Sequence, residues 1–255
     1  MTMPPTTPTT PDTIITAAIL VIGDEILSGR TKDKNIGYIA DHLTQIGIQL
    51  KEVRVVPDEE AEIVAAVNAL RPRYTYVFTT GGIGPTHDDI TADCIAKAFG
   101  VGIDIDPRAR ALLLPYFIKR GVEPTPGRMR MARIPFGAAL VENKLSIAPG
   151  FMLENVIVMA GIPNVMQVML DAVTPMLKVG KKMQSVTIPL TRPEGEIAAM
   201  FGQVQAEFPD CPMGSYPHFT DGKYGTQLVI RSTDETRLAA AEAVLRARLA
   251  ENGWM

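Results

Sequence analysis

The segment Val77–Thr91, "VFTTGGIGPTHDDIT", links a strand-like run to a glycine-rich turn. Its first four residues are apolar or β-branched, which is typical of a buried strand. Two adjacent glycines stop that run, and a third glycine, a proline, a histidine and two aspartates follow. A buried strand that turns directly into a helix is the repeating unit of parallel sheets. The segment therefore predicts an α/β fold with unusual chemistry at a strand end.

Strand and helix patterns alternate on both sides of this segment. This alternation predicts a three-layer α/β sandwich with a mostly parallel sheet over residues 14–178. The proline at position 115 predicts a kink or a break in one of the helices. The expected strands lie at 16–23, 49–57, 74–80 and 155–163, and the expected helices at 35–47, 58–72, 89–99, 107–121 and 164–177.

The pattern changes after the basic stretch at 178–184. Beyond it the order is β-α-β-β-α, which predicts a small α+β module with an antiparallel sheet over residues 184–255. Asp234 is expected to cap its last helix. At the other end, residues 1–13 are rich in proline and threonine and lack the features of a signal peptide, so we expect a disordered tail. The expected strands of the module lie at 185–191, 212–219 and 226–233, and its helices at 194–209 and 234–253.

The amino-acid composition of the chain argues against several classes of binding partner. The chain has 25 basic and 28 acidic residues, a formal charge of −3, which does not favour a nucleic-acid partner. No apolar run is long enough to span a bilayer, so no membrane partner is expected. Cys94 and Cys211 are far apart and show no zinc-site spacing, which fits a reducing, cytoplasmic location. These features leave a small molecule as the expected partner.

The glycines at 81, 82 and 84 predict a site for phosphate. Glycine lets the backbone approach a ligand closely and lets successive N–H groups point toward an anion. The helix that follows adds the positive end of its dipole. The alternative is a tight turn that needs positive φ angles, and the segment lacks the Lys-Ser/Thr pair of a P-loop.

Asp88 and Asp89 add a second kind of chemistry to the turn. Two carboxylates would repel a phosphate unless a divalent cation lay between them, and Mg²⁺, Mn²⁺ or Co²⁺ binds both kinds of oxygen. Asp24, Glu25 and Asp58 follow other predicted strands at the same edge of the sheet. The alternatives are helix capping for the first pair and solvated turns for the other three. His87 is a candidate ligand of phosphate or metal, although a single loop histidine is more often neither.

Five motifs in order carry a family resemblance: "GDEILSG", "TTGGIGPTHDDIT", "MARIP", "APGF" and "AGIPN". Together they resemble the molybdopterin-binding-like (MoaB/Mog) superfamily, in particular CinA-type proteins and the equivalent domain of FAD synthases. The similarity extends over residues 14–177, and the module that follows looks like the small domain of CinA-type chains. The resemblance implies a fold that binds a pterin or nucleotide carrying phosphate groups, and it is also the basis for expecting a homo-oligomer.

The resemblance assigns roles to individual residues. It implies catalytic roles for Asp58 and Asp89, and with the carboxylate argument it places a divalent cation at Asp24, Asp88 and Asp89. Arg128, Met129 and Arg130 stand where CinA-type chains usually read "NRK", which leaves Arg128, Arg130 and Arg133 as candidate phosphate contacts or as a solvated helix face. The implied ligand- and phosphate-binding residues are Gly23, Ser28, Gly81, Gly82, Gly84, Pro85, Thr86, His87, Thr91, Arg130, Ser146, Pro149, Gly150, Gly161, Pro163 and Asn164.

Two functions follow from these expectations. The first is a metal-dependent nucleotide pyrophosphatase that cleaves ADP-ribose, FAD or a related dinucleotide. The second is a protein of molybdenum cofactor biosynthesis that binds molybdopterin without hydrolysing it. A scaffold with an empty pocket is a third alternative, which the retention of all five motifs disfavours. With 255 residues, we expect the chain to lack the extra domains of longer CinA-type chains or FAD synthases.

Overall fold

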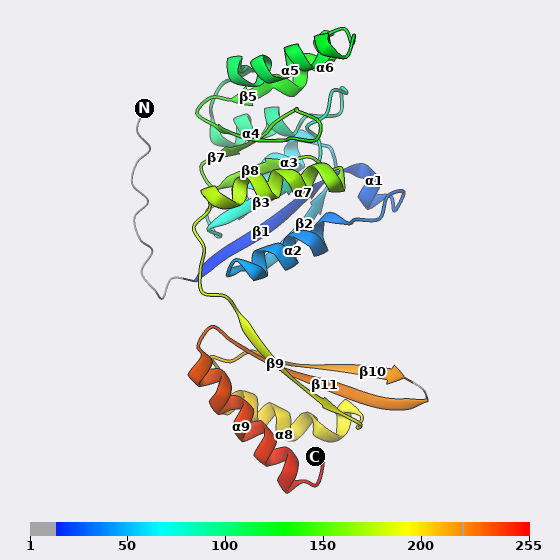
Figure 1. The fold of residues 1–255 in the computed structure, drawn as a ribbon, viewed down its shortest axis with the longest axis vertical. Coiled ribbons are helices and arrows are strands. Elements are labelled where there is room, and N and C mark those ends of the chain that lie inside the picture. The colour runs from blue at the N-terminus through cyan, green and yellow to red at the C-terminus, as the bar shows by residue number, and fades with distance from the viewer. Residues whose placement is uncertain (1–13, 221) are drawn as a thin grey trace. The chain divides into compact units, whose positions relative to one another are not determined.

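A computed structural model describes residues 14–220 and 222–255, so the expected tail at 1–13 lies outside the described residues. The chain divides between Gly180 and Lys181 into two compact units, each of which is described separately below. The first contains the alternating elements predicted for residues 14–178, and the second contains the small module (Figure 1).

The large unit is built on a six-stranded sheet in the order β2-β1-β3-β8-β7-β6. The first four of these strands are parallel, whereas β7 is antiparallel to β8 and β6 is antiparallel to β7. A separate pair, β4 and β5, is antiparallel. The strands are β1 Ile15–Ile22, β2 Ile48–Val56, β3 Tyr76–Thr80, β4 Ile103–Ile105, β5 Arg133–Pro135, β6 Ala139–Val141, β7 Gly150–Leu153 and β8 Val156–Met159.

Two apolar cores lie on opposite faces of this sheet. Along β1, Leu20 and Ile22 contribute to one core and Ile19 and Val21 to the other, as the two-residue period of a strand requires. Figure 1 shows α2 and α7 in front of the sheet and α3 and α4 behind it. The predicted three-layer sandwich with a mostly parallel sheet is therefore confirmed. The four helices are α2 Asn35–Gln45, α3 Glu60–Leu70, α4 Thr91–Phe99 and α7 Pro163–Val173.

Helix α5 (Pro107–Lys119) passes through Pro115 without interruption, so the break that the proline suggested does not occur. Asp106 caps its start by accepting hydrogen bonds from two backbone amides. Ala109, Leu113 and Phe117 are buried along one face, and Pro115 lies on the exposed side. Packing of the buried face holds the helix together despite the missing amide. Short helical segments complete the unit: α1 Asp24–Leu27, α6 Pro126–Met129, η1 Arg130–Ala132 and η2 Thr174–Met176.

The small unit has the predicted β-α-β-β-α order. Its antiparallel sheet runs in the order β10-β11-β9, and its core joins Ile188 and Leu228 of the sheet to Phe201 and Leu245 of the helices. Asp234 accepts the amides of the first turn of α9, as predicted. The elements are β9 Gln184–Leu190, α8 Glu194–Glu207, β10 Met213–Thr220, β11 Lys223–Ser232 and α9 Glu235–Glu251.

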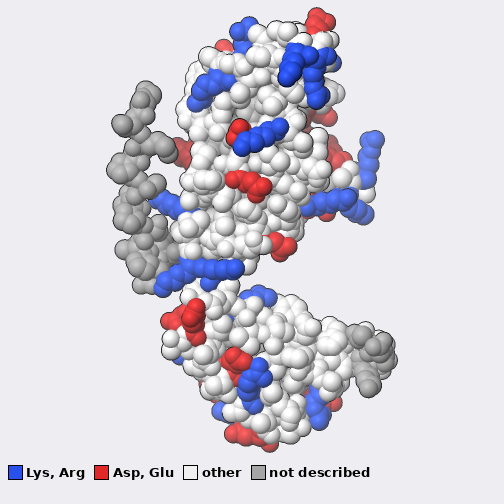
Figure 2. Space-filling model, viewed as in Figure 1, with Lys and Arg blue, Asp and Glu red and all other residues white. Residues whose placement is uncertain are grey.

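Acidic and basic side chains are interspersed over the face that Figure 2 shows, with wide uncharged areas between them. Both cysteines are buried free thiols. In the described part of the chain, no helix combines the length and the apolar character needed to cross a membrane.

Candidate functional site

The loops after β1, β3 and β8 meet at one edge of the sheet. Because the three strands are parallel neighbours, their carboxyl ends lie side by side. Backbone hydrogen bonds lock the junction, from the Gly23 amide to the Val56 carbonyl (3.1 Å) and from the Gly81 amide to the Met159 carbonyl (3.2 Å). The sequence motifs that follow these strands are thus brought together.

A cavity of about 580 Å³ opens at this edge. Its lining combines a glycine loop with an apolar wall, and its charged lining residues, among those described, are all acidic. The predicted ligand or catalytic residues that line it are Gly81, Gly82, Gly84, Pro85, Asp89, Ser146, Gly161 and Pro163. The other lining residues are Glu25, Thr31, Ile83, Met131, Asn143, Ala148, Ala160, Ile162, Val165 and Met169.

The backbone conformation and its close contacts require glycine at positions 81 and 82. Their φ angles are 106° and 63°, a region that residues with a Cβ atom rarely adopt. A Cβ on Gly81 would lie 2.0 Å from the Ile22 carbonyl oxygen, and one on Gly82 would lie 2.2 Å from the Thr91 hydroxyl. Both glycines are therefore needed for a tight turn with positive φ angles. The same turn exposes backbone without side chains to the cavity.

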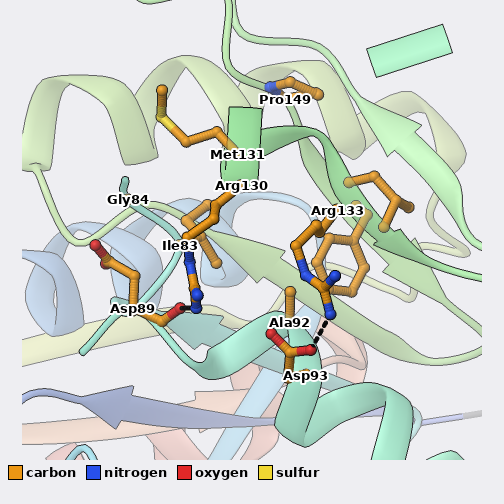
Figure 3. A pocket seen from close by; sticks show the side chains of 12 residues that line it. Ile83, Gly84, Asp89, Ala92, Asp93, Arg130, Met131, Arg133 and Pro149 are labelled. Carbon is orange, nitrogen blue, oxygen red and sulfur yellow. Dashed lines mark hydrogen bonds and ion pairs between the residues drawn. The ribbon is translucent and has the colours of Figure 1, made fainter. Parts of the chain in front are cut away.

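Asp89, at the C-terminal end of the glycine loop, stabilises the loop by hydrogen bonding. Its Oδ2 accepts hydrogen bonds from the Thr86 amide (2.8 Å) and the Thr86 hydroxyl. The guanidinium of Arg130 donates to the backbone carbonyl of Asp89 (3.2 Å), as Figure 3 shows. A Cβ on Gly84 would lie 2.6 Å from the same Oδ2. Asp89 thus shapes the loop while its side chain also lines the cavity.

Acidic side chains gather beside the cavity. The Oδ2 of Asp58, at the end of β2, accepts the amide of Asp24 at the end of β1 (2.9 Å). Burial raises the pKa of Asp58, the Asp24 amide opposes this effect, and the charges of Glu25, Asp24 and Asp88 raise that pKa further. The loops after three strands therefore concentrate negative charge around Asp58.

This donor set fits a hard divalent cation that is shared with a ligand. Within residues 14–220 and 222–255, no three His, Cys, Asp or Glu side chains are arranged to hold a metal by themselves. Mg²⁺ is usually held by one or two carboxylates together with substrate phosphates rather than by an all-protein cage. Asp24 and Asp88 offer two carboxylates of this kind, and a cation between them would relieve the repulsion that acts on Asp58.

Several predicted ligand residues belong to the framework around the cavity. The buried Thr91 donates its hydroxyl to the Gly81 carbonyl (3.0 Å), which fixes the glycine turn on α4. Gly150 is the first residue of β7, and a Cβ there would meet the Val158 carbonyl oxygen at 2.3 Å. The predicted residues outside the lining of the large cavity are Gly23, Asp24, Ser28, Asp58, Thr86, His87, Asp88, Thr91, Arg130, Pro149, Gly150 and Asn164.

Arg130 and Pro149 line a second, much smaller cavity behind the glycine loop (Figure 3). Its volume is about 20 Å³, room for roughly one water molecule. Arg133 forms an ion pair with Asp93 at its edge, whereas Arg128 donates to the Glu123 carbonyl (2.8 Å). In the structure the three arginines therefore hold protein groups around the site.

Asn35 and Asn143 are buried polar residues that the sequence did not single out. The Nδ2 of Asn143 donates to the Ser146 hydroxyl (2.6 Å) and to the Ala148 carbonyl (2.9 Å), and its Oδ1 accepts the amides of Leu145 and Ser146. An asparagine that begins a loop after a strand is a known turn signal and offered a clue to this position. Asn143 therefore positions Ser146 at the cavity.

The family model described as a probable molybdopterin-binding domain matches residues 18–179, the part of the chain that forms this site. The chain belongs to the molybdopterin-binding domain family. This membership confirms the resemblance carried by the five motifs. A second model, the middle domain of FAD synthase, matches residues 182–255 and therefore the small unit.

Relatives of this molybdopterin-binding domain protein occur in archaea. A protein of Pyrobaculum arsenaticum is 34% identical over 210 residues, which is 79% of each chain. A protein of Aeropyrum pernix is 36% identical over 167 residues, covering 64% of this chain and 62% of the relative. The crystal structure of the protein CinA, described as of unknown function, from Thermoplasma acidophilum is 34% identical, with a TM-score of 0.58. It covers 63% of this chain and 96% of its own.

Proposed function

We propose that the large unit binds a dinucleotide such as ADP-ribose or FAD and hydrolyses its pyrophosphate with the help of a divalent cation. The observation that carries this proposal is a cavity lined by a bare glycine loop and by the carboxylates of Glu25 and Asp89. The charges of Asp24, Glu25 and Asp88 act on Asp58 beside it. The match of the small unit to the middle domain of FAD synthase supports a flavin nucleotide among the candidate substrates.

The cavity has the size and the lining expected for such a ligand. Its volume of about 580 Å³ lies within the range of about 300–1,000 Å³ that is typical of small-molecule sites. Ala160, Ile162 and Met169 supply an apolar wall that suits a planar ring. The glycine loop and the start of α4 supply backbone amides and a favourable dipole for phosphate. The two ends of a nucleotide thus have separate surfaces.

Among the described residues that line the cavity, none is basic and able to offset the charge of a pyrophosphate. Asp24 and Asp88 would hold the cation together with phosphate oxygens, and the cation when bound offsets that charge and lowers the pKa of a water molecule. Asp58 would take the proton of the attacking water, since its raised pKa makes it a better base than an ordinary aspartate. Water adds to one phosphorus, the bridging P–O bond breaks, and FAD yields AMP and FMN.

Purified protein should release AMP from FAD or ADP-ribose when Mg²⁺, Mn²⁺ or Co²⁺ is added, and chelation by EDTA should stop the release. Because the lining is acidic, the cation is needed for the ligand to bind as well as to react. Chromatography of the products measures the reaction. If no AMP appears with any of the three metals, the hydrolytic function is wrong.

Asp89→Asn should lower turnover by about 100-fold, a typical loss for a positioned polar group at a reacting phosphate. The asparagine keeps an oxygen that can accept the Thr86 amide, so the melting temperature should stay unchanged. Asp171→Asn, at an exposed position of α7, is the matched control and should retain full activity. Equal activity of the two variants would remove Asp89 from the mechanism.

Molybdopterin binding without hydrolysis is the second candidate, favoured by the description of the matching family. Both kinds of ligand carry phosphate and a planar ring system, so the same surfaces would serve. Titration with molybdopterin distinguishes the two functions. Binding at micromolar concentration without AMP release from any dinucleotide would favour the pterin.

A further inference from the structure

Asn35, the first residue of α2, makes an unusual contact with the site. The residue is 4% exposed, and its Nδ2 donates to the Gly161 carbonyl at 2.8 Å, across 126 residues of sequence. Its Oδ1 is also buried but has no hydrogen-bond partner. This contact joins the start of α2 to the loop that follows β8.

That loop forms one wall of the cavity. Gly161 lines the cavity, and a Cβ placed on it would lie 3.3 Å from the Cα of Gly81, so the two glycine turns touch. The next residue, Ile162, also lines the cavity, and its carbonyl accepts the amides that begin α7. A shift of Gly161 would therefore move the apolar wall relative to the glycine loop.

The unpaired Oδ1 indicates that Asn35 is not there for packing alone. A buried acceptor without a partner destabilises the folded state, and such groups are rare in native proteins. A small apolar residue would fill much of the same space without that penalty. Proteins keep such an unfavourable buried polar group mainly where it contributes to a functional site.

Attachment of α2 to the sheet does not depend on Asn35. Ile39 and Leu43 of the same helix are fully buried in the core. Farther along the helix, the His42 ring is hydrogen-bonded to the Thr174 hydroxyl (2.8 Å), beyond the end of α7. His42 therefore links α2 to the segment after α7 at a point away from the cavity. Its substitution is a control for the substitution of Asn35.

We infer that Asn35 is a positioning residue that fixes the Gly161 loop against the Gly81 turn and so sets the width of the ligand cavity. The inference about the loop stands on the contacts above, and its effect on a nucleotide rests on the proposed function. Asn35 acts through the Gly161 carbonyl and lies outside the lining of the cavity.

Asn35→Asp and Asn35→Ala test this inference against His42→Ala. The aspartate has nearly the same shape, and its ionised form cannot donate to the Gly161 carbonyl. Hydrogen exchange of the 160–162 segment reports on the loop without any ligand. Calorimetric titration with the non-hydrolysable analogue α,β-methylene-ADP in Mn²⁺ reports on the cavity.

Both Asn35 variants should show exchange of the 160–162 segment about tenfold faster, and a Kd for the analogue about tenfold weaker, than the wild type, as expected for one lost hydrogen bond. Asn35→Ala should also shift the melting temperature by no more than about 3 °C, because the loss of the contact is offset by removal of the unpaired oxygen. His42→Ala should leave loop exchange and Kd unchanged.

Unchanged loop exchange in both Asn35 variants would overturn the inference, and so would an equal effect of His42→Ala. An unchanged Kd would overturn the part that concerns the cavity. If the wild type itself fails to bind the analogue, the proposed function fails, and hydrogen exchange still decides the role of Asn35.

Discussion

Asp58→Asn should lower hydrolysis of FAD or ADP-ribose by about 1,000-fold, the size of effect expected when a general base is removed. Asp58 lies where the charges of Glu25, Asp24 and Asp88 all act on it, and it is the described carboxylate of the site whose pKa is raised. Asparagine keeps an oxygen that can accept the Asp24 amide, so the junction between β1 and β2 should persist. Product formation measured under single-turnover conditions gives the size of the loss.

The same substitution should leave the large unit at least as stable at neutral pH. A carboxyl group whose pKa is raised by folding favours the folded state below its unfolded pKa of about 3.9, and this contribution disappears as the pH rises through the folded pKa. Wild type should therefore be less stable than Asp58→Asn at pH 7, and the difference should shrink as the pH falls toward 4. Calorimetry in EDTA, which removes bound metal, measures this difference.

Glu59→Gln is the matched control, since Glu59 is an exposed neighbour whose side chain makes no capping hydrogen bond. It should retain activity and show the pH dependence of the wild type. An Asp58→Asn protein that is inactive because it has unfolded would refute this account of Asp58. Full activity would remove Asp58 as the base.

Gly81→Ala should destabilise the large unit by about 3–5 kcal/mol, which corresponds to roughly 10 °C in melting temperature, and should abolish ligand binding. The added Cβ would lie 2.0 Å from the Ile22 carbonyl oxygen, a backbone atom that can move only if β1 moves. The φ angle of 106° adds conformational strain. Since Gly81 also touches Gly161, displacement would open the cavity from both sides.

Gly100→Ala separates the steric effect from the conformational one. Gly100 ends α4 with a φ angle of 66°, and nothing lies within 4 Å of a Cβ built there. The alanine should cost only about 1 kcal/mol, the penalty of the left-handed conformation alone. Equal losses in the two variants, measured by urea denaturation, would show that the contact with Ile22 is unimportant.

The large unit was predictable because its elements have clear periods. The β-branched run that ends at Thr80 and the glycines after it identify a buried strand and its turn, and similar runs identify β1, β2 and β8. The hairpin of β6 and β7 was missed because its strands, Ala139–Val141 and Gly150–Leu153, are too short to show a period. Pro115 does not break α5, because burial of one face of the helix outweighs the local preference of the proline.

The site was predictable where a loop follows a strand, because the topology alone brings such loops together. Gly81, Asp89 and Gly161 meet at the cavity for this reason. Asn35 was not predictable, since an asparagine at a helix start is indistinguishable in sequence from an ordinary cap. The positions of Met131 and Met169 in the lining of the cavity could not be predicted either. Long-range packing decides which apolar side chains face a cavity and which face the core.

The strand order has a consequence for how the molecule is made. On the ribosome, Tyr76–Thr80 emerges well before Val156–Met159, yet the two segments are hydrogen-bonded neighbours in the finished sheet. Until the later segment arrives, one side of the earlier one is an open edge that another nascent chain could pair with. A polypeptide interrupted before Val156 therefore carries half of a ligand site and an exposed template for aggregation.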